Sequence, residues 1–136
     1  MPEAFPVQLV SPEQVLFEGA AEMVVCRPSD GEIAFLYGHV PYLGALTDDV
    51  VRILFPGSGE LAAAVHGGFV QMTGDHLVVL SDVAELAEHI DVARAERARA
   101  AAEEALARDP DDEAAAAALR RAEVRLRVAT GSAAAH

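Results

Sequence analysis

The chain has 136 residues, enough for one small domain with an appendage, and 52% of them are apolar. Its net charge of −12 argues against nucleic acid and against an anionic lipid surface as the main partner. The single cysteine, Cys26, excludes a disulfide framework within the chain. Since no apolar run approaches the roughly 20 residues of a membrane-spanning helix and no signal peptide is recognised, we expect a cytoplasmic chain without direct membrane insertion.

The first 82 residues contain short segments of strand length, separated by turn-forming residues. Phe5–Val10 alternates apolar and polar positions. Gly74-Asp75 is a two-residue hairpin candidate, because glycine accepts the positive φ that a type II′ turn requires. Many short strands at close spacing predict a β-sandwich or flattened barrel of about ten strands. The other apolar segments that support this prediction are 22–26, 50–54, 61–65, 69–72 and 77–80.

The composition changes near Ala84, after which Ala, Glu, Arg and Leu dominate, all of them good helix formers. We expect Asp91 to be the N-cap of a first helix that ends near Arg108. Asp109 is the expected N-cap of a second helix, with Pro110 at its first helical position.

These patterns predict an α+β fold with two domains. Residues 1–84 form the β-sandwich, and residues 85–136 form an antiparallel helical hairpin that ends in a short disordered tail. Residues 1–82 hold two Arg against eleven acids, whereas residues 83–136 hold eight Arg against eleven acids, which suggests different roles for the two parts. Because Ala fills most of the hairpin, its packing buries little area per residue, and we expect it to detach or extend easily.

Several motifs occur in an order and spacing that resemble one family, the epsilon subunit of bacterial F-type ATP synthase. The resemblance covers roughly residues 5–127. One departure is Asp48-Asp49, which stands where the family commonly has Gly before Val50. The motifs are Ser11-Pro-Glu with Val15-Leu-Phe17, Gly31-Glu-Ile-Ala-Phe-Leu-Tyr-Gly-His-Val-Pro41, Val65-His-Gly-Gly-Phe69 and Ala84-Glu-Leu-Ala-Glu-His-Ile-Asp-Val-Ala-Arg-Ala95.

The resemblance implies a non-catalytic subunit of the proton-translocating ATP synthase. It would belong to the central rotor stalk, couple proton flow to ATP synthesis, and lie peripherally on the cytoplasmic face of the bacterial cell membrane. The family's β domain approaches the gamma subunit and the membrane c-ring, which implies partner-binding roles for Glu32, Gly38, His39 and Pro41.

The resemblance also implies a regulatory role for the helical hairpin. In an extended state it would reach the catalytic beta subunits and restrain ATP hydrolysis. We expect its arginines to give this extended form an acidic partner that the folded form need not supply. These arginines are Arg120, Arg121, Arg125 and Arg127.

The segment Ile90-Asp-Val-Ala-Arg-Ala95 matches a family pattern that in some bacterial members is associated with ATP binding. No cofactor is required, and ATP is a possible regulatory ligand. A purely structural explanation stays open, because Asp91 can cap the helix with Arg94 at i+3 as its ion partner. The candidate site comprises Ile90, Asp91, Arg94 and Ala95, with Arg121 and Arg125 to meet the phosphates.

Two other classes of function are alternatives to a subunit of ATP synthase. One is a stand-alone nucleotide-binding sensor or adaptor with the same fold. The other is a metal-dependent enzyme, which we do not expect, because the histidines fall on different elements without ligand spacing and no P-loop or nucleophile elbow is present. The histidines in question are His39, His66, His76 and His89.

Overall fold

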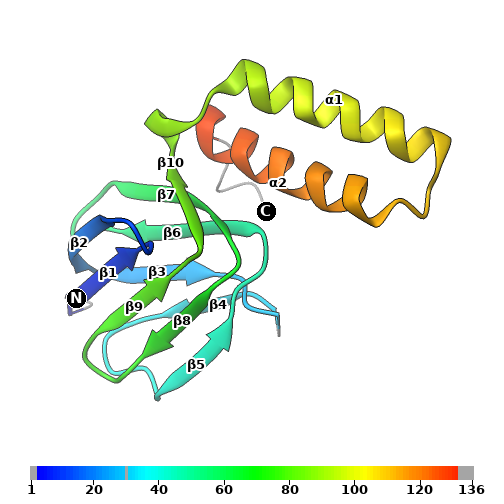
Figure 1. Cartoon of the computed structure of the whole chain (residues 1–136). Coiled ribbons are helices and arrows are strands. Elements are labelled where there is room, and N and C mark those ends of the chain that lie inside the picture. The colour runs from blue at the N-terminus through cyan, green and yellow to red at the C-terminus, as the bar shows by residue number, and fades with distance from the viewer. Residues whose placement is uncertain (1–2, 30, 132–136) are drawn as a thin grey trace.

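The structure is a computed structural model that describes residues 3–29 and 31–131. Within them, ten strands precede two helices (Figure 1). The predicted α+β fold is confirmed. The predicted disordered tail, residues 132–136, lies outside the described residues. The strands are β1 (Phe5–Val10), β2 (Val15–Ala21), β3 (Met23–Cys26), β4 (Ile33–Phe35), β5 (Tyr42–Ala45), β6 (Asp49–Leu54), β7 (Glu60–His66), β8 (Phe69–Met72), β9 (Leu77–Leu80) and β10 (Val83–Leu86), followed by the short 3₁₀ helix η1 (Ala87–His89) and by α1 (Val92–Arg108) and α2 (Glu113–Thr130).

The strands form two five-stranded sheets that pack face to face. The outer sheet has the order β2-β1-β9-β8-β5, and the helix-facing sheet has the order β10-β7-β6-β3-β4. All strand pairs are antiparallel except β1 and β9, which run parallel. The predicted domain boundary at residue 84 lies inside β10, which pairs with β7.

The sandwich core follows from the alternation of apolar residues along each strand. In β1, the side chains of Phe5, Val7 and Leu9 are fully buried between the sheets. In β6, Val51 faces this core while its neighbour Val50 is buried on the opposite face. A strand buried on both faces needs a cover on each side, and α2 provides the second one.

Two glycine turns fix the strand connections. Gly74 has the expected positive φ, 90°, in the connection between β8 and β9, where the Thr73 N–H donates to the His76 carbonyl across Gly74-Asp75 at 3.0 Å. Gly68, between β7 and β8, has a φ of 108°, and a Cβ atom there would lie 2.1 Å from the carbonyl oxygen of Leu80. Only glycine fits that position without moving the backbone.

The helix caps differ in part from the sequence prediction. Asp91 is the N-cap of α1, and its carboxylate accepts a hydrogen bond from the Arg94 backbone N–H at 3.0 Å. The N-cap of α2 is Asp112 rather than Asp109, and Asp112 accepts from the Ala115 N–H at 2.9 Å. The prediction for Asp109 and Pro110 is therefore wrong, because Asp109 instead closes α1 by donating its N–H to the Ala105 carbonyl at 2.9 Å.

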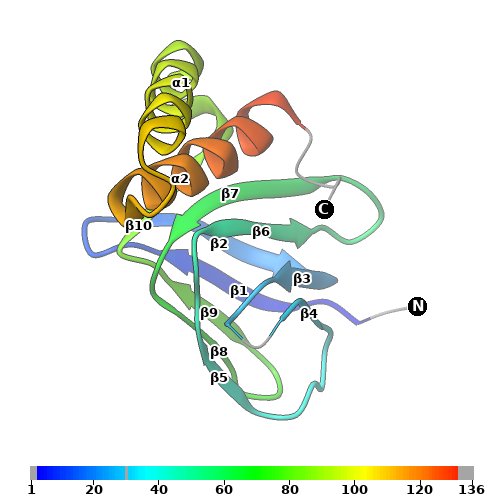
Figure 2. The same cartoon turned by 90° about the vertical axis from the view of Figure 1, so that its right-hand side faces the viewer.

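The two helices form a third and a fourth layer on one side of the sandwich. Figures 1 and 2 show α2 lying across the helix-facing sheet, with α1 outside it. Small side chains line the contact between the helices, and the buried ones are Ala95, Ala102, Ala115 and Ala122. This arrangement makes α2 the element through which the hairpin is held on the sandwich.

Candidate functional site

A small apolar seam joins α2 to the helix-facing sheet. Val124 and Val128 project from α2 onto Val50 of β6 and Ala64 of β7, and all four side chains are buried. Ile90, just before α1, packs against the edge of this cluster. The seam is distinct from the sandwich core and much smaller, so it holds the hairpin with less apolar area than the sandwich uses to hold itself.

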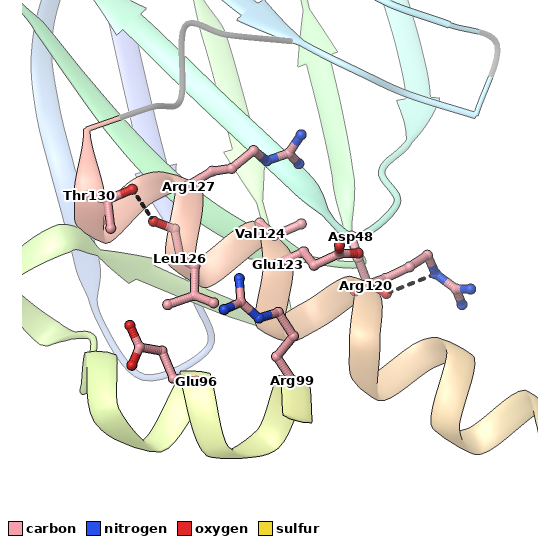
Figure 3. Close-up of a pocket in the computed structure, with 9 residues that line it drawn as sticks. All are labelled: Asp48, Glu96, Arg99, Arg120, Glu123, Val124, Leu126, Arg127 and Thr130. Carbon is pink, nitrogen blue, oxygen red and sulfur yellow. Dashed lines mark hydrogen bonds and ion pairs between the residues drawn. The ribbon is translucent and has the colours of Figure 1, made fainter. Parts of the chain in front are cut away.

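Ion pairs surround the seam and reach from α2 to the sandwich. The Arg125 Nε donates to Glu85 Oε1 at 2.7 Å, and the Arg127 Nη2 donates to Asp49 Oδ1 at 3.0 Å. Arg120 Nε lies 3.9 Å from Asp48 Oδ2 (Figure 3). In the docked hairpin, three of the four arginines expected to serve the extended form thus already have carboxylate partners on the sandwich.

Two of these carboxylate partners, Asp48 and Asp49, lie at one end of β6. Asp49 is the first residue of the strand, and Asp48 immediately precedes it. Asp49 is also 3.6 Å from the Nε of Arg27 on the sandwich side. Acids at this end of the central strand face the arginine-rich half of α2, so charge complementarity orients the helix on the sheet.

A buried histidine completes the network. His66, at the end of β7, is 8% exposed. Its Nδ1 lies 3.3 Å from Asp48 Oδ1, and its Nε2 lies 3.2 Å from Glu85 Oε1. The hydrogen bond from His66 lowers the pKa of Glu85; burial opposes this, and the hydrogen bond and charge of Arg125 add to it. Glu85 is therefore held as a carboxylate by two hydrogen-bond donors, the His66 ring of the sandwich and the Arg125 guanidinium of α2.

One hollow of about 540 Å³ lies beside this network, between the helices and the start of β6. Three arginines and three acids are among the residues that line it. Figure 3 shows that Arg99 and Glu96 project from α1 while Arg127 extends from the other side of α2, so the guanidinium groups do not converge on one point. The mixed charges indicate ion pairing between elements rather than a site for a single small anion.

A second hollow, of about 300 Å³, lies at the junction of η1 and α1. Four of the predicted ATP-site residues in the junction segment line it, together with Arg125 from α2. Arg121 is not among its lining residues. Glu85 and His89 are lining residues that the sequence analysis misses. The predicted residues that line the hollow are Ile90, Asp91, Arg94, Ala95 and Arg125.

The predicted partner-binding residues of the sandwich do not form one cluster. Gly38, His39 and Pro41 lie in the β4–β5 loop, where the Gly38 N–H donates to the Gly74 carbonyl at 2.8 Å and the His39 ring packs edge-on against Phe35. Glu32 precedes β4 and lies 4.0 Å from Arg27. The β4–β5 loop and the β8–β9 turn occupy the end of the sandwich remote from the helices (Figures 1 and 2).

The comparisons with known proteins agree over most of the chain. Residues 4–87 match the family model described as the beta-sandwich domain of the ATP synthase delta/epsilon chain, and residues 88–130 match the model of its long alpha-helix domain. The chain belongs to the ATP synthase delta/epsilon chain family. The prediction of an epsilon-type, non-catalytic subunit of ATP synthase is thereby confirmed, and the stand-alone sensor or adaptor is not favoured.

Individual relatives support the assignment. The ATP synthase epsilon chain of Thermobifida fusca is 46% identical over 126 residues, covering 90% of each chain. That of Streptomyces griseus is 44% identical over 121 residues, covering 89% of this chain and 91% of its own. A chain in the cryo-EM structure of the Euglena gracilis mitochondrial ATP synthase (OSCP/F1/c-ring, rotational state 1) has the same fold, with a TM-score of 0.72 at 20% identity over all of this chain and 84% of that one.

Three further features concern the partners of the chain, membrane-spanning helices and metal-binding groups. The partners of this family member are subunits of ATP synthase. Neither helix in the described part of the chain is long and apolar enough to cross a membrane. Over residues 3–29 and 31–131, no three His, Cys, Asp or Glu side chains are grouped so that they could hold a metal ion.

Proposed function

We propose that the sandwich anchors this subunit on the rotor and that the hairpin is a detachable inhibitor of ATP hydrolysis. The observation that carries the proposal is the way α2 is held. A small apolar seam and three exchangeable ion pairs keep the hairpin docked, whereas the sandwich has its own separate core. Exposed or half-exposed ion pairs contribute under about 1 kcal/mol each, so acids on another subunit can replace those of the sandwich.

The released hairpin would reach the catalytic beta subunits with its arginines. Among the described residues Arg121 makes no ion pair, whereas Arg120, Arg125 and Arg127 do. Arg121 can therefore meet an acidic partner without first leaving one on the sandwich. We expect it to contribute to inhibition without contributing to docking.

The test is the ATP hydrolysis rate of the assembled enzyme with variants of this subunit. A chain ending at Leu86 should raise hydrolysis while leaving assembly intact. Arg121→Ala should also raise hydrolysis without changing the stability of the docked hairpin. Arg125→Ala should destabilise the docked form as well, and so should raise hydrolysis less than Arg121→Ala. If the truncated and full-length subunits support equal rates, the hairpin is not an inhibitor.

For the rotor contact we propose the outer face of the outer sheet and the adjoining β4–β5 loop. Leu43, Phe69 and Leu80 are 68%, 54% and 46% exposed there and line one shallow apolar hollow. Exposed apolar side chains gathered on one sheet face mark a protein-binding surface. The gamma subunit would cover this face, and the loop with Gly38, His39 and Pro41 would approach the c-ring, which would keep the subunit peripheral on the cytoplasmic side of the membrane.

This surface can be tested by co-purification. Phe69→Gln and Leu43→Gln should each reduce the amount of subunit that travels with gamma. Val92→Gln is the control, because Val92 is another exposed apolar side chain but stands on α1. Equal recovery of gamma with all three variants would remove this face from the interface.

The composition of the junction hollow also favours ATP as a regulatory ligand. The junction hollow brings Arg94 and Arg125 together with the apolar side chains of Ile90 and Ala95, a combination that fits phosphates and a base. Glu85 and Asp91 offset the two arginines, so we expect weak binding. Nucleotide held between α1 and α2 would favour the docked hairpin, because the site requires both helices.

Calorimetric titration of the isolated subunit with Mg-ATP tests this site. Arg94→Ala should lower the affinity, and Arg97→Ala, which removes an exposed arginine from the same helix outside the hollow, should not. Glu85→Gln should raise the affinity by removing a competing carboxylate. Equal affinity in wild type and Arg94→Ala would exclude the site.

A further inference from the structure

His66 lies on the face of the helix-facing sheet that α2 covers. Alternate residues of a strand face the same side, so His66 shares its side with Ala64 and Ala62, both of which pack against the seam beneath α2. It is the only buried histidine among the described residues. Leaving the sheet would move α2 away from His66 and admit water to the ring.

The two carboxylates that flank His66 are the same ones that α2 uses. Glu85 Oε1 lies 3.2 Å from His66 Nε2 and 2.7 Å from Arg125 Nε. Asp48 lies 3.3 Å from His66 Nδ1 through one oxygen and 3.9 Å from Arg120 Nε through the other. The histidine and the helix therefore share two acids, and a positive charge on His66 competes with the arginines for them.

Two further groups of charged or titratable side chains lie near His66 and α2. Asp49 pairs with Arg127 of α2 and with Arg27, the residue that follows β3. His89 of η1, an exposed histidine, lines the junction hollow with Glu85 and Arg125. His89 is thus the other group near Glu85 that can change its charge near neutral pH.

We propose that His66 is a proton-sensitive switch for hairpin docking, in which the neutral ring favours the docked hairpin and the protonated ring favours its release. The carboxylates of Asp48 and Glu85 belong to the sandwich and stay beside His66 in both states, so they do not discriminate between them. The docked and released states differ in the hydration of the His66 ring and in the presence of arginines beside it. Release hydrates the ring and removes Arg120 and Arg125, and both changes favour a charged imidazolium.

The sign of the effect follows from this difference. A proton shifts the equilibrium only through its unequal affinity for the two states. Acidification through the range in which histidine titrates, about pH 8 to 5, therefore releases the hairpin. Glu85 stays ionised over this range, since its lowered pKa lies below it. If the released hairpin restrains hydrolysis, as proposed above, acid conditions also strengthen that restraint.

The experiment uses the full-length isolated subunit and needs no ATPase assay, so its outcome is independent of the inhibitory role. Methyl NMR signals of Val124 and Val128 report docking, because both side chains contact the sheet in the docked hairpin. In the wild type, the ratio of docked to released hairpin should fall about threefold to tenfold between pH 8 and pH 5.5. His66→Gln keeps a neutral donor at this position and should make the ratio independent of pH.

Two matched controls replace other histidines. His76→Gln changes an exposed histidine in the β8–β9 turn, and His89→Gln changes the one near Glu85. Both should retain the acid release of the wild type. Acid release that persists in His66→Gln would overturn the proposal.

A folding defect in His66→Gln is detected from the methyl signals of Val7 and Val79 in the sandwich core. In that case the wild type and the two control variants decide. The proposal would be overturned if the docked-to-released ratio of the wild type did not change with pH or rose on acidification. Loss of acid release in His89→Gln would also overturn it.

Discussion

Glu85 is the carboxylate through which the hairpin and the sandwich are most closely joined, and Glu85→Gln tests how much it contributes. The substitution keeps the shape of the side chain and removes its charge. It weakens two charge-assisted hydrogen bonds, one from Arg125 at 2.7 Å and one from His66 at 3.2 Å. Hydrogen bonds to charged groups contribute about 1.5–3 kcal/mol when buried. Because the Glu85 and Arg125 side chains are 24% and 30% exposed, we expect a loss of only about 1–2 kcal/mol of hairpin stability.

The pH dependence of this loss has a definite sign. His66 and Arg125 lower the pKa of Glu85 in the folded protein. A lowered pKa contributes stability that is present above the unfolded pKa and is lost as the pH falls through the folded one. The difference in stability between wild type and Glu85→Gln should therefore be full at pH 7 and shrink below about pH 4.

Urea unfolding followed by circular dichroism at 222 nm measures this difference, since the helices dominate that signal. Glu88→Gln is the matched control, because Glu88 is an exposed glutamate on the neighbouring η1. The double variant with Arg125→Gln should lose less than the sum of the two single variants, because the shared interaction can be lost only once. A Glu85→Gln effect that equals the control, or one that grows on acidification, would refute the assigned role.

Three further predictions address the packing, the cysteine and the independence of the sandwich. Ala102→Leu should overpack the seam between the helices and cost about 1–3 kcal/mol, whereas Ala101→Leu on the exposed face of the same helix should be nearly neutral in the same urea experiment. Cys26 is 2% exposed and burial raises its pKa to about 12, so a thiol reagent at pH 8 should label it only after unfolding. A chain ending at Leu86 should give a cooperative thermal transition, because the sandwich core contains no helical residue; an unfolded fragment would contradict this.

The sequence predicts the β-sandwich and the helices because their patterns are local. Period-two alternation in β1 and the switch to Ala-rich composition after Ala84 each specify an element without long-range information. Four strands, β2, β4, β5 and β10, are not among the segments predicted from the apolar patterns. Strands β4 and β5 have only three and four residues and β5 contains Gly44, whereas β10 lies where the composition already changes to that of the helices. The cap of α2 is misassigned because Asp109 and Asp112 offer the same carboxylate chemistry three residues apart, and only the backbone path distinguishes them.

The network around His66 could not be predicted in the same way, because it depends on strand register. His66 pairs with Val83 and Ala64 pairs with Glu85, which places Glu85 diagonally across from His66 on one face. Asp48 is 18 residues from His66 in sequence and reaches it only through the β6–β7 pairing. One signal was available, namely the two adjacent acids Asp48 and Asp49 directly before the predicted strand 50–54.

The acids beneath α2 also limit how freely the hairpin can leave. Release removes Arg120, Arg125 and Arg127 from Asp48, Glu85 and Asp49, and these like charges lie close together at one end of the sheet. In water each lost pair contributes little, but repulsion among the three carboxylates adds to the loss. A proton on His66 relieves part of this repulsion. Acids on another subunit would pair with the arginines of the released α2. Each change favours release, and release is most favourable when both occur together, so the docked hairpin is favoured in the isolated subunit at neutral pH.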